Sequence, residues 1–249
     1  KIIMKNLFYK ILLSFFIFLN IISFVYAGDK EVAVEYIVTM NKVELCEDGS
    51  TTANCLNPIT ISPSGKSLNV DIAGVNAGVA AGNFGSLGLA VIGKTYTFAQ
   101  ITMNRLFTLK GTVAGCSTDE NATAGGVNAY ATGKVGGSPT AMTVAVPNTV
   151  AGSSTGMGAT LGDHITGVAA DGTVNSSGSG NISKTETQMQ FRKILNGALT
   201  LRAGSIPSLE IAFGTDLALE SQKGFVAGLT ACTHAIFNVA EPDISITPK

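Results

Sequence analysis

Tryptophan is absent from this 249-residue chain, histidine occurs only twice, and charged residues make up 13% of it. Because typical soluble domains carry about 25% charged residues, solubility here depends on Thr, Ser, Asn and exposed backbone. A profile rich in Gly, Ala, Thr, Ser and Val is common in extracellular and surface-array proteins and uncommon in cytosolic enzymes. The lack of tryptophan disfavours a carbohydrate-binding module, since such sites usually present exposed aromatic side chains.

Basic residues are not in excess. Setting aside Lys1, Lys5 and Lys10 leaves 13 of the 16 basic residues against 17 acidic ones, a net charge of −4. This balance provides neither the electrostatic footprint of a nucleic-acid-binding protein nor a basic stripe for an anionic membrane. We therefore expect no nucleic-acid partner, and contact with a membrane only through the N-terminal segment before it is cleaved.

Residues 1–27 have the order of a secretory signal peptide. A basic stretch precedes the apolar run 11–22, and the small residues Val25 and Ala27 then form an A-x-A-like cleavage signal. We predict cleavage after Ala27, which leaves Gly28 as the new N-terminus. The mature protein is then secreted or held at the cell surface, with the periplasm as a further location.

Two alternatives compete with a cleaved signal peptide. The apolar stretch 7–26 reaches the roughly 20 residues that a membrane-spanning helix needs, so a retained anchor is the competing interpretation. A pilin-like N-terminus is disfavoured because no acidic residue lies between Lys1 and Gly28. The abundance of Ile, Lys, Asn and Phe in this segment is typical of AT-rich bacterial genomes.

The chain has four cysteines, at positions 46, 55, 116 and 232. An even number of cysteines behind a signal peptide predicts disulfides. The favoured pairing is Cys46–Cys55, which closes a short loop, with Cys116–Cys232 as a long-range link; two other pairings remain open. A zinc site made of all four is disfavoured because no C-x2-C spacing occurs.

Segment 31–40 has the clearest strand pattern. It alternates with a period of two, so that one face is shared by Val32, Val34, Tyr36, Val38 and Met40. The pattern changes register at Asn41-Lys42, so that Val43 and Leu45 fall on the opposite parity. This change predicts a β-bulge or bend.

Many further short strands are expected. They are separated by Gly, Pro and Asn, and we place them at 59–61, 68–72, 95–104, 106–113, 141–146, 185–195, 198–201, 209–213, 225–229, 235–239 and 243–247. Segments 95–104 and 106–113 form either one long bent strand or two consecutive strands. Asn196-Gly197 predicts a hairpin turn, and a helix over 189–201 is its competitor. Residues 73–93 are expected to form a structured loop with a helical turn.

These patterns predict an all-β fold, a β-sandwich or jelly-roll-like domain with long Gly/Ser/Thr-rich loops, preceded by the hydrophobic signal helix. Residues 28–249 are expected to form a single extracytoplasmic domain. Within it, residues 117–184 form a loop-rich insertion, because Gly, Ser, Ala, Thr and Asn dominate there and hydrophobic residues occur singly.

One short motif resembles a nucleophile elbow. Ser154 lies in a G-x-S-x-G match, but that motif needs a strand before it and a helix after it, and the residues that follow do not open a helix. A serine hydrolase using Ser154 and His234 is therefore disfavoured. Asp163 and His164 offer two metal ligands, yet adjacent residues on an extended chain point in opposite directions, so a polar loop is the preferred interpretation.

Residues 171–175 resemble the start of a calcium loop but lack the later Glu that such a loop needs. Glycosylation sequons occur at Asn121, Asn175 and Asn181. We expect no catalytic residue, no resident cofactor and no metal, and hence a protein that is not an enzyme.

The sequence favours a secreted structural or adhesive surface protein, a subunit of an extracellular filament that assembles through terminal β-strands. The regular segments at 31–40 and 243–247 are the strands that a neighbouring subunit would receive. The competing expectation is that both pair within their own domain. An extracellular ligand- or carbohydrate-binding module is the alternative function, and a secreted serine hydrolase is the third.

Overall fold

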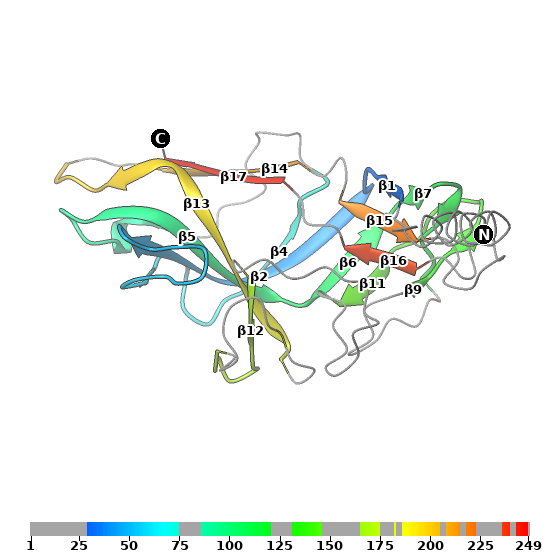
Figure 1. Cartoon of the computed structure of the whole chain (residues 1–249), viewed down its shortest axis with the longest axis horizontal. Coiled ribbons are helices and arrows are strands. Elements are labelled where there is room, and N and C mark those ends of the chain that lie inside the picture. Colours follow the sequence, from blue (N-terminus) through cyan, green and yellow to red (C-terminus); the bar gives the residue numbers. More distant parts are fainter. Residues whose placement is uncertain are drawn as a thin grey trace, which may run out of the picture.

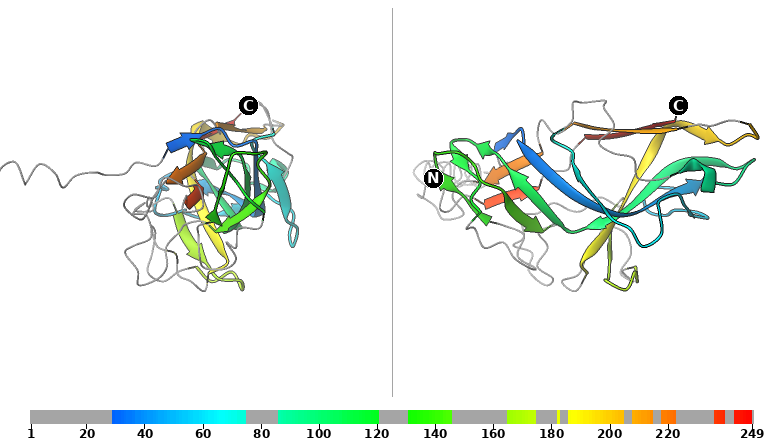
Figure 2. Two further views of the ribbon diagram at one scale, coloured as in Figure 1. Left: turned by 90° about the vertical axis from the view of Figure 1, so that its right-hand side faces the viewer. Right: turned by 180° about the vertical axis from the view of Figure 1, so that it is seen from behind.

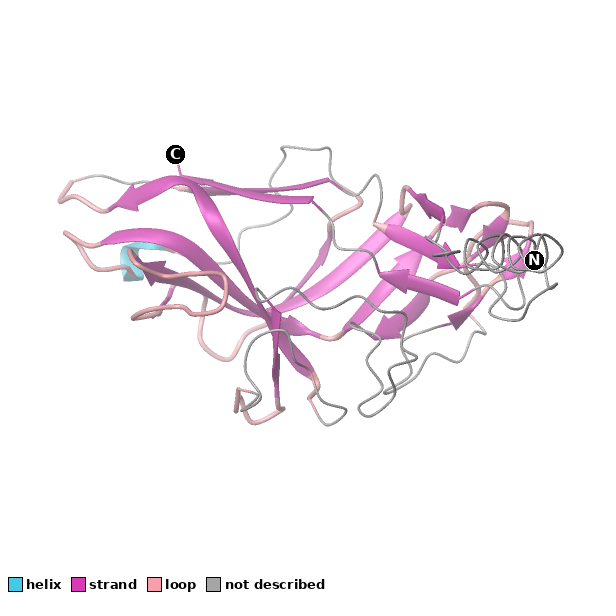
Figure 3. Ribbon diagram, in the orientation of Figure 1, coloured by secondary structure: helices cyan, strands magenta, loops and turns pink. Residues whose placement is uncertain are grey.

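The computed structural model describes residues 29–74, 86–120, 131–145, 165–174, 182, 186–204, 208–214, 218–222, 236–239 and 243–248. Within these residues the fold is almost entirely β, with one 3-10 helix, η1 (Leu87–Leu89) (Figure 3). The all-β prediction is confirmed, and η1 confirms the expected helical turn. Residues 1–27 lie outside the described part. No helix among the described residues is long and apolar enough to cross a bilayer.

The largest sheet forms the body of the elongated molecule (Figure 1). Its strands follow the order β11-β6-β2-β5-β13-β12, and β3 and β4 also pair with β2. Their bounds are β2 (Glu35–Glu47), β3 (Ile59–Thr60), β4 (Leu68–Asp71), β5 (Thr95–Asn104), β6 (Leu106–Lys110), β11 (Met142–Ala145), β12 (Ile165–Val168) and β13 (Gln188–Thr200). All the pairings are antiparallel.

Three smaller sheets complete the described fold. One contains β1 (Asp29–Glu31), β15 (Leu219–Gln222), β16 (Ile236–Val239) and β9 (Ala131–Thr132). Another contains β10 (Lys134–Val135), β8 (Cys116–Ser117) and β7 (Thr112–Val113), and the third pairs β14 (Leu209–Gly214) with β17 (Asp243–Pro248). The first two lie at one end of the molecule, and β14 and β17 lie toward the other, while β2 runs between the two ends (Figure 2).

Strand β2 confirms most of the predicted alternation. Its side chains at Tyr36, Val38 and Met40 are buried, and the register with β5 shifts between Met40 and Lys42, which confirms the bulge. Val43 and Leu45 are then buried from the opposite parity. The prediction fails for Val32 and Val34, which are 52% and 62% exposed because they precede β2 and lie in no strand.

The segment 95–113 forms separate strands. Arg105 separates β5 from β6, and its backbone N–H donates to Thr187 O at 3.0 Å. β5 and β6 both pair with β2, and along their other edges β5 pairs with β13 whereas β6 pairs with β11. The break therefore lets one stretch of sequence serve two regions of the sheet.

The predicted hairpin at Asn196-Gly197 is wrong, and so is the competing helix. β13 runs without interruption through both residues, and its register with β5 shifts between Ile194 and Leu199. Gly197 has a φ of 103°, so the Asn-Gly pair forms an irregularity within one strand instead of a turn. Leu195 and Leu199, on either side of it, both reach the hydrophobic core, which favours one continuous strand.

Among the other predicted strands, those at 59–61, 68–72, 141–146, 209–213, 235–239 and 243–247 are confirmed by β3, β4, β11, β14, β16 and β17. The segment 225–229 lies outside the described residues. β12 and β15 were not predicted, and neither were the two-residue strands β9 and β10. β12 lies in the segment predicted to be loop-rich.

The core joins the large sheet to the smaller ones. Tyr36 and Phe107 contact edge to face with ring centroids 5.6 Å apart, and Leu109 is fully buried beside them in the same cluster. Phe213 and Ile246 bring the β14–β17 pair into this core. Burial of these side chains supplies the main driving force for the fold.

Candidate functional site

The described residues contain a polar cluster buried against the large sheet. Strand register places its members on two neighbouring rows across β2, β5, β13 and β12. One row is Glu44, Gln100 and Arg192, and the other is Lys42, Thr102, Gln190 and Thr166. We call these seven residues the polar ladder. All except Lys42 are at most 7% exposed, which is unusual for such side chains.

Gln100 lies at the centre of the first row and bonds to both neighbours. Its Nε2 donates to Glu44 Oε2 at 2.8 Å, and its Oε1 accepts from Arg192 Nε at 2.7 Å. The amide thus presents a donor to the carboxylate and an acceptor to the guanidinium. Lys42 Nζ lies 3.0 Å from Glu44 Oε1 and adds a second cation to the carboxylate.

Arg192 links the two rows. Its Nη1 donates to Thr166 Oγ1 at 3.1 Å, and its Nη2 donates to Gln190 Oε1 at 3.1 Å. Nη1 also reaches the backbone oxygen of Thr52 at 3.4 Å. A buried arginine is tolerated when its N–H donors are satisfied in this way. The arrangement holds strands and a loop together.

That loop is held by a disulfide. Cys46 and Cys55 are bonded, with Cα atoms 5.1 Å apart, which confirms this predicted pair. Ser50 Oγ donates to Glu47 O at 2.6 Å and accepts from Leu56 N at 3.0 Å, so the loop is also bonded internally. The loop therefore presents the Thr52 carbonyl to Arg192 from a constrained backbone.

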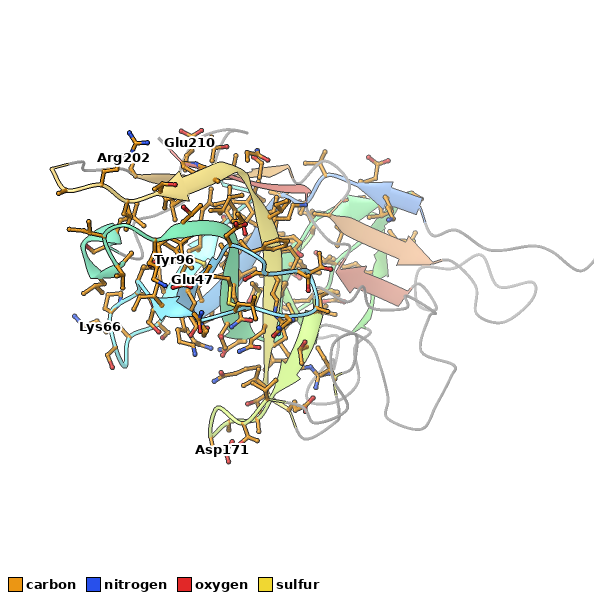
Figure 4. All side chains as sticks on the ribbon, turned by 60° about the vertical axis from the view of Figure 1, so that its left-hand side comes forward. Glu47, Lys66, Tyr96, Asp171, Arg202 and Glu210 are labelled. Atoms are coloured by element: carbon orange, nitrogen blue, oxygen red, sulfur yellow. A yellow bond between two sulfur atoms is a disulfide. The ribbon has the colours of Figure 1, made fainter. Side chains whose placement is uncertain are left out.

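Glu47 anchors the end of β2. Its Oε1 lies 2.9 Å from Lys94 Nζ, and its Oε2 accepts from Asn57 Nδ2 at 3.0 Å. The hydrogen bond from Lys94, followed by that from Asn57, lowers the pKa of Glu47 below its ordinary value. Figure 4 shows Glu47 beside Tyr96, its partner in the β2–β5 register.

Thr102 is the exception within the polar ladder. Its side chain is 5% exposed, and its Oγ1 has no hydrogen-bond partner in the described structure. Buried hydroxyl groups normally have at least one partner. Since Thr102 lies on the row between Lys42 and Gln190, the unsatisfied atom is in the interior of the cluster.

A second buried polar contact lies at the break between β5 and β6. Arg105 Nη1 donates to the backbone oxygen of Glu186 at 2.7 Å, and both residues are buried. Burial lowers the pKa of Arg105, and the charge of Glu186 opposes that shift. A Cβ on Gly167 of β12 would overlap the Glu186 carboxyl group, so a larger residue there would force that buried side chain to move.

The structure places some of the residues singled out in the sequence. Cys116 is disulfide-bonded and fully buried, but its predicted partner Cys232 lies outside the described residues, so that pairing stays a prediction. The remaining candidates that lie outside the described part are Ala27, Gly28, Asn121, Ser154, Asp163, His164, Asn175, Asn181 and His234.

Asp171 belongs to a tight turn after β12. Its Oδ1 accepts from Thr173 N at 2.9 Å, and hydrogen bonds from Thr173 lower its pKa below the ordinary value. A side chain that bonds to the backbone two residues ahead is a common turn device. Within the described ranges, no group of three or more His, Cys, Asp or Glu side chains is placed to hold a metal ion.

Three exposed apolar side chains lie close together in the chain. Leu89, Val91 and Ile92 are 55%, 50% and 66% exposed within four residues of chain that precede β5. Gly93 N donates to Leu201 O, which places this segment beside the chain that leaves β13. We call Leu89, Val91 and Ile92 the apolar tip.

The sequence predicts a strand over 185–195, which contains Gln190 and Arg192, but it does not predict the polar ladder. Polar residues alternate with other residues over 187–192, and polar residues at every second position of a strand normally face water. The available signal was a charged residue, Glu44, between the apolar residues Val43 and Leu45, which follow the predicted strand 31–40. No family model, curated protein or solved structure matches the chain, so comparison with known proteins does not indicate a role for the polar ladder.

Proposed function

We propose that this protein is an exported structural or adhesive surface protein that acts as a subunit of an extracellular filament. The observation that carries the proposal is the elongated β body: β2 and β13, each 13 residues long, pair with β5 and are cross-linked by the polar ladder. A disulfide-constrained loop is bonded to the same cluster. Such cross-linking suits a load-bearing role outside the reducing cytoplasm. The proposal also keeps the β-sandwich that the sequence predicts as the architecture of this domain.

Self-association through strands is the proposed means of assembly. In the single chain β2 pairs with β3 and β4 along one edge and with β5 and β6 along the other, so donation of residues 35–40 would remove an interior strand. β1 pairs with β15, and the C-terminal strand β17 pairs with β14. The proposal therefore relies on strands at sheet edges, to which a neighbour can add a strand while the domain stays intact.

The test uses the protein purified from the exporting cell under native conditions. We expect size-exclusion chromatography across a concentration series to show concentration-dependent self-association, and electron microscopy to show filaments. A strict monomer up to millimolar concentration would contradict the filament role. Mapping of unreduced peptides is expected to recover a Cys46–Cys55 link and a Cys116–Cys232 link, whereas free thiols would contradict export to an oxidising compartment.

A ligand-binding module is the second candidate, and the apolar tip favours it. Exposed apolar side chains grouped on one loop mark interaction sites more often than scattered ones do. Ile92→Asp would then lower binding of the protein to beads coated with phenyl groups or glycans. Val135→Asp is the matched control, because Val135 is also exposed, at 71%, but lies in β10 at the opposite end. Equal binding by both variants would argue against a binding tip.

A further inference from the structure

Strand β14 has a described strand, β17, along one edge and none along the other. It pairs with β17 over the full length from Leu209 to Gly214. On its other side β17 lies beside β13, and Asn196 Nδ2 donates to Thr247 Oγ1 at 3.4 Å. β17 is therefore enclosed between β14 and β13. Alternate backbone groups of β14 point away from β17, and no other described strand pairs with them.

Three other edge strands of the described sheets are protected. β1 consists of Asp29, Lys30 and Glu31, and charged side chains discourage pairing at an edge. All of β12 is buried, with the Glu186 carboxyl group against Gly167. The edge strand β11 lies beside β9 and β16. Each of these strands has a device that opposes the addition of a further strand.

β14 lacks such protection. Its sequence, LEIAFG, has one charged residue and neither lysine nor proline. Leu209, Ile211 and Ala212 are partly exposed, so apolar surface accompanies the open backbone. A strand that paired here would cover this surface as well as bond to the backbone.

The sequence of β14 is compatible with pairing to itself. In an antiparallel pair centred on Ile211, Leu209 of one copy lies opposite Phe213 of the other, and Ile211 lies opposite its counterpart. The apolar residues of both copies then share the face that packs on the core. Glu210 lies opposite Ala212, so like charges do not meet, whereas a pair centred on Glu210 would place two carboxylates in opposition.

The geometry points to a two-fold dimer in which β14 pairs with β14 of a second copy of this chain, joining two domains through one continuous sheet. This inference rests on the proposed function and names the contact that self-association would use. A two-fold contact closes on itself, so it supplies one of the contacts of a filament and a second contact extends it. Pairing over 209–213 is a small interface and is expected to be weak in dilute solution.

A charge-reversal pair of variants tests the inference. In the Ile211-centred register, Ala212→Glu places a new carboxylate opposite Glu210 at both ends of the pair, whereas Ala212→Lys places an ammonium there. Sedimentation velocity over a concentration series is expected to show a dimer dissociation constant about tenfold or more higher for Ala212→Glu than for wild type. Ala212→Lys is expected to dimerise at least as tightly as wild type, and high salt is expected to reduce the difference between the two variants.

Comparing the two variants distinguishes an effect on dimerisation from an effect on folding. Ala212 is partly exposed, so Glu and Lys disturb its site similarly, and urea unfolding of both variants checks that they remain folded. Equal weakening by both variants would overturn the register, and equal dimerisation by wild type and both variants would place the contact elsewhere while leaving self-association intact. A wild-type protein that stays monomeric throughout would overturn this inference and the filament role together.

Discussion

Arg192 Nε donates a hydrogen bond to Gln100 Oε1 at 2.7 Å across the β5–β13 pair, with both side chains buried. Replacing Arg192 with Met keeps an unbranched stem but leaves its buried acceptors without a donor. Loss of one partner from a buried charged network costs about 3–5 kcal/mol, so we expect the free energy of unfolding in urea to fall by that amount. The control is Lys193→Met in the same strand, which should change it by less than about 0.5 kcal/mol. Similar losses in both variants would show that the network does not stabilise the fold.

Two threonines in the polar ladder are expected to respond in opposite directions to the same substitution. Thr102→Val removes a buried hydroxyl group that has no partner, so stability should stay constant or rise, by up to about 1–3 kcal/mol. Thr166→Val removes the acceptor of Arg192 Nη1 and should cost about 1–3 kcal/mol. Urea unfolding measures both changes. A loss at Thr102 equal to that at Thr166 would indicate that the Thr102 hydroxyl is hydrogen-bonded in solution, for which an internal water is the simplest partner.

Local sequence patterns predicted most of the strands, because a strand with one buried face has apolar residues at every second position. The alternation at Tyr36, Val38 and Met40, and the change of parity at Val43, identified both β2 and its bulge. The short Cys46–Cys55 spacing identified the disulfide loop. These signals depend on residues that lie close together in the chain, so they can be recognised in a single sequence.

Long-range contacts account for what the sequence did not predict. Asn196-Gly197 is a good turn signal, but β5 pairs on both sides of it and keeps β13 continuous. The polar ladder needed knowledge that Glu44, Gln100 and Arg192 align across three strands. Alternation alone cannot distinguish polar residues that face water from polar residues that face one another.

Gly167→Ala should be destabilising. The added methyl group would overlap the Glu186 carboxyl group and would lie 3.0 Å from the Ile182 backbone, so the buried Glu186 side chain would have to shift. Overpacking of this kind costs about 1–3 kcal/mol, measurable as a lower free energy of unfolding in urea. Gly88→Ala is the control, because its nearest neighbour would be Ser86 Oγ at an ordinary 3.4 Å. A neutral Gly167→Ala would mean that Glu186 is not held over β12 in solution.

The pKa of Glu47 should depend on Lys94. Lys94 is the main cause of its depression, so Lys94→Met is expected to raise the Glu47 pKa toward its ordinary value of 4.5, as followed by NMR titration of the side-chain carboxyl carbon. A carboxyl group whose pKa is lower in the folded than in the unfolded state stabilises the fold above its unfolded pKa, and this contribution is lost as pH falls through the folded pKa. The stability difference between wild type and Lys94→Met should therefore be present at neutral pH and shrink below pH 4.5. Lys66→Met is the matched control, because Lys66 is exposed and has no ion pair in the described structure. An unchanged Glu47 titration in Lys94→Met would mean that the ion pair does not persist in solution.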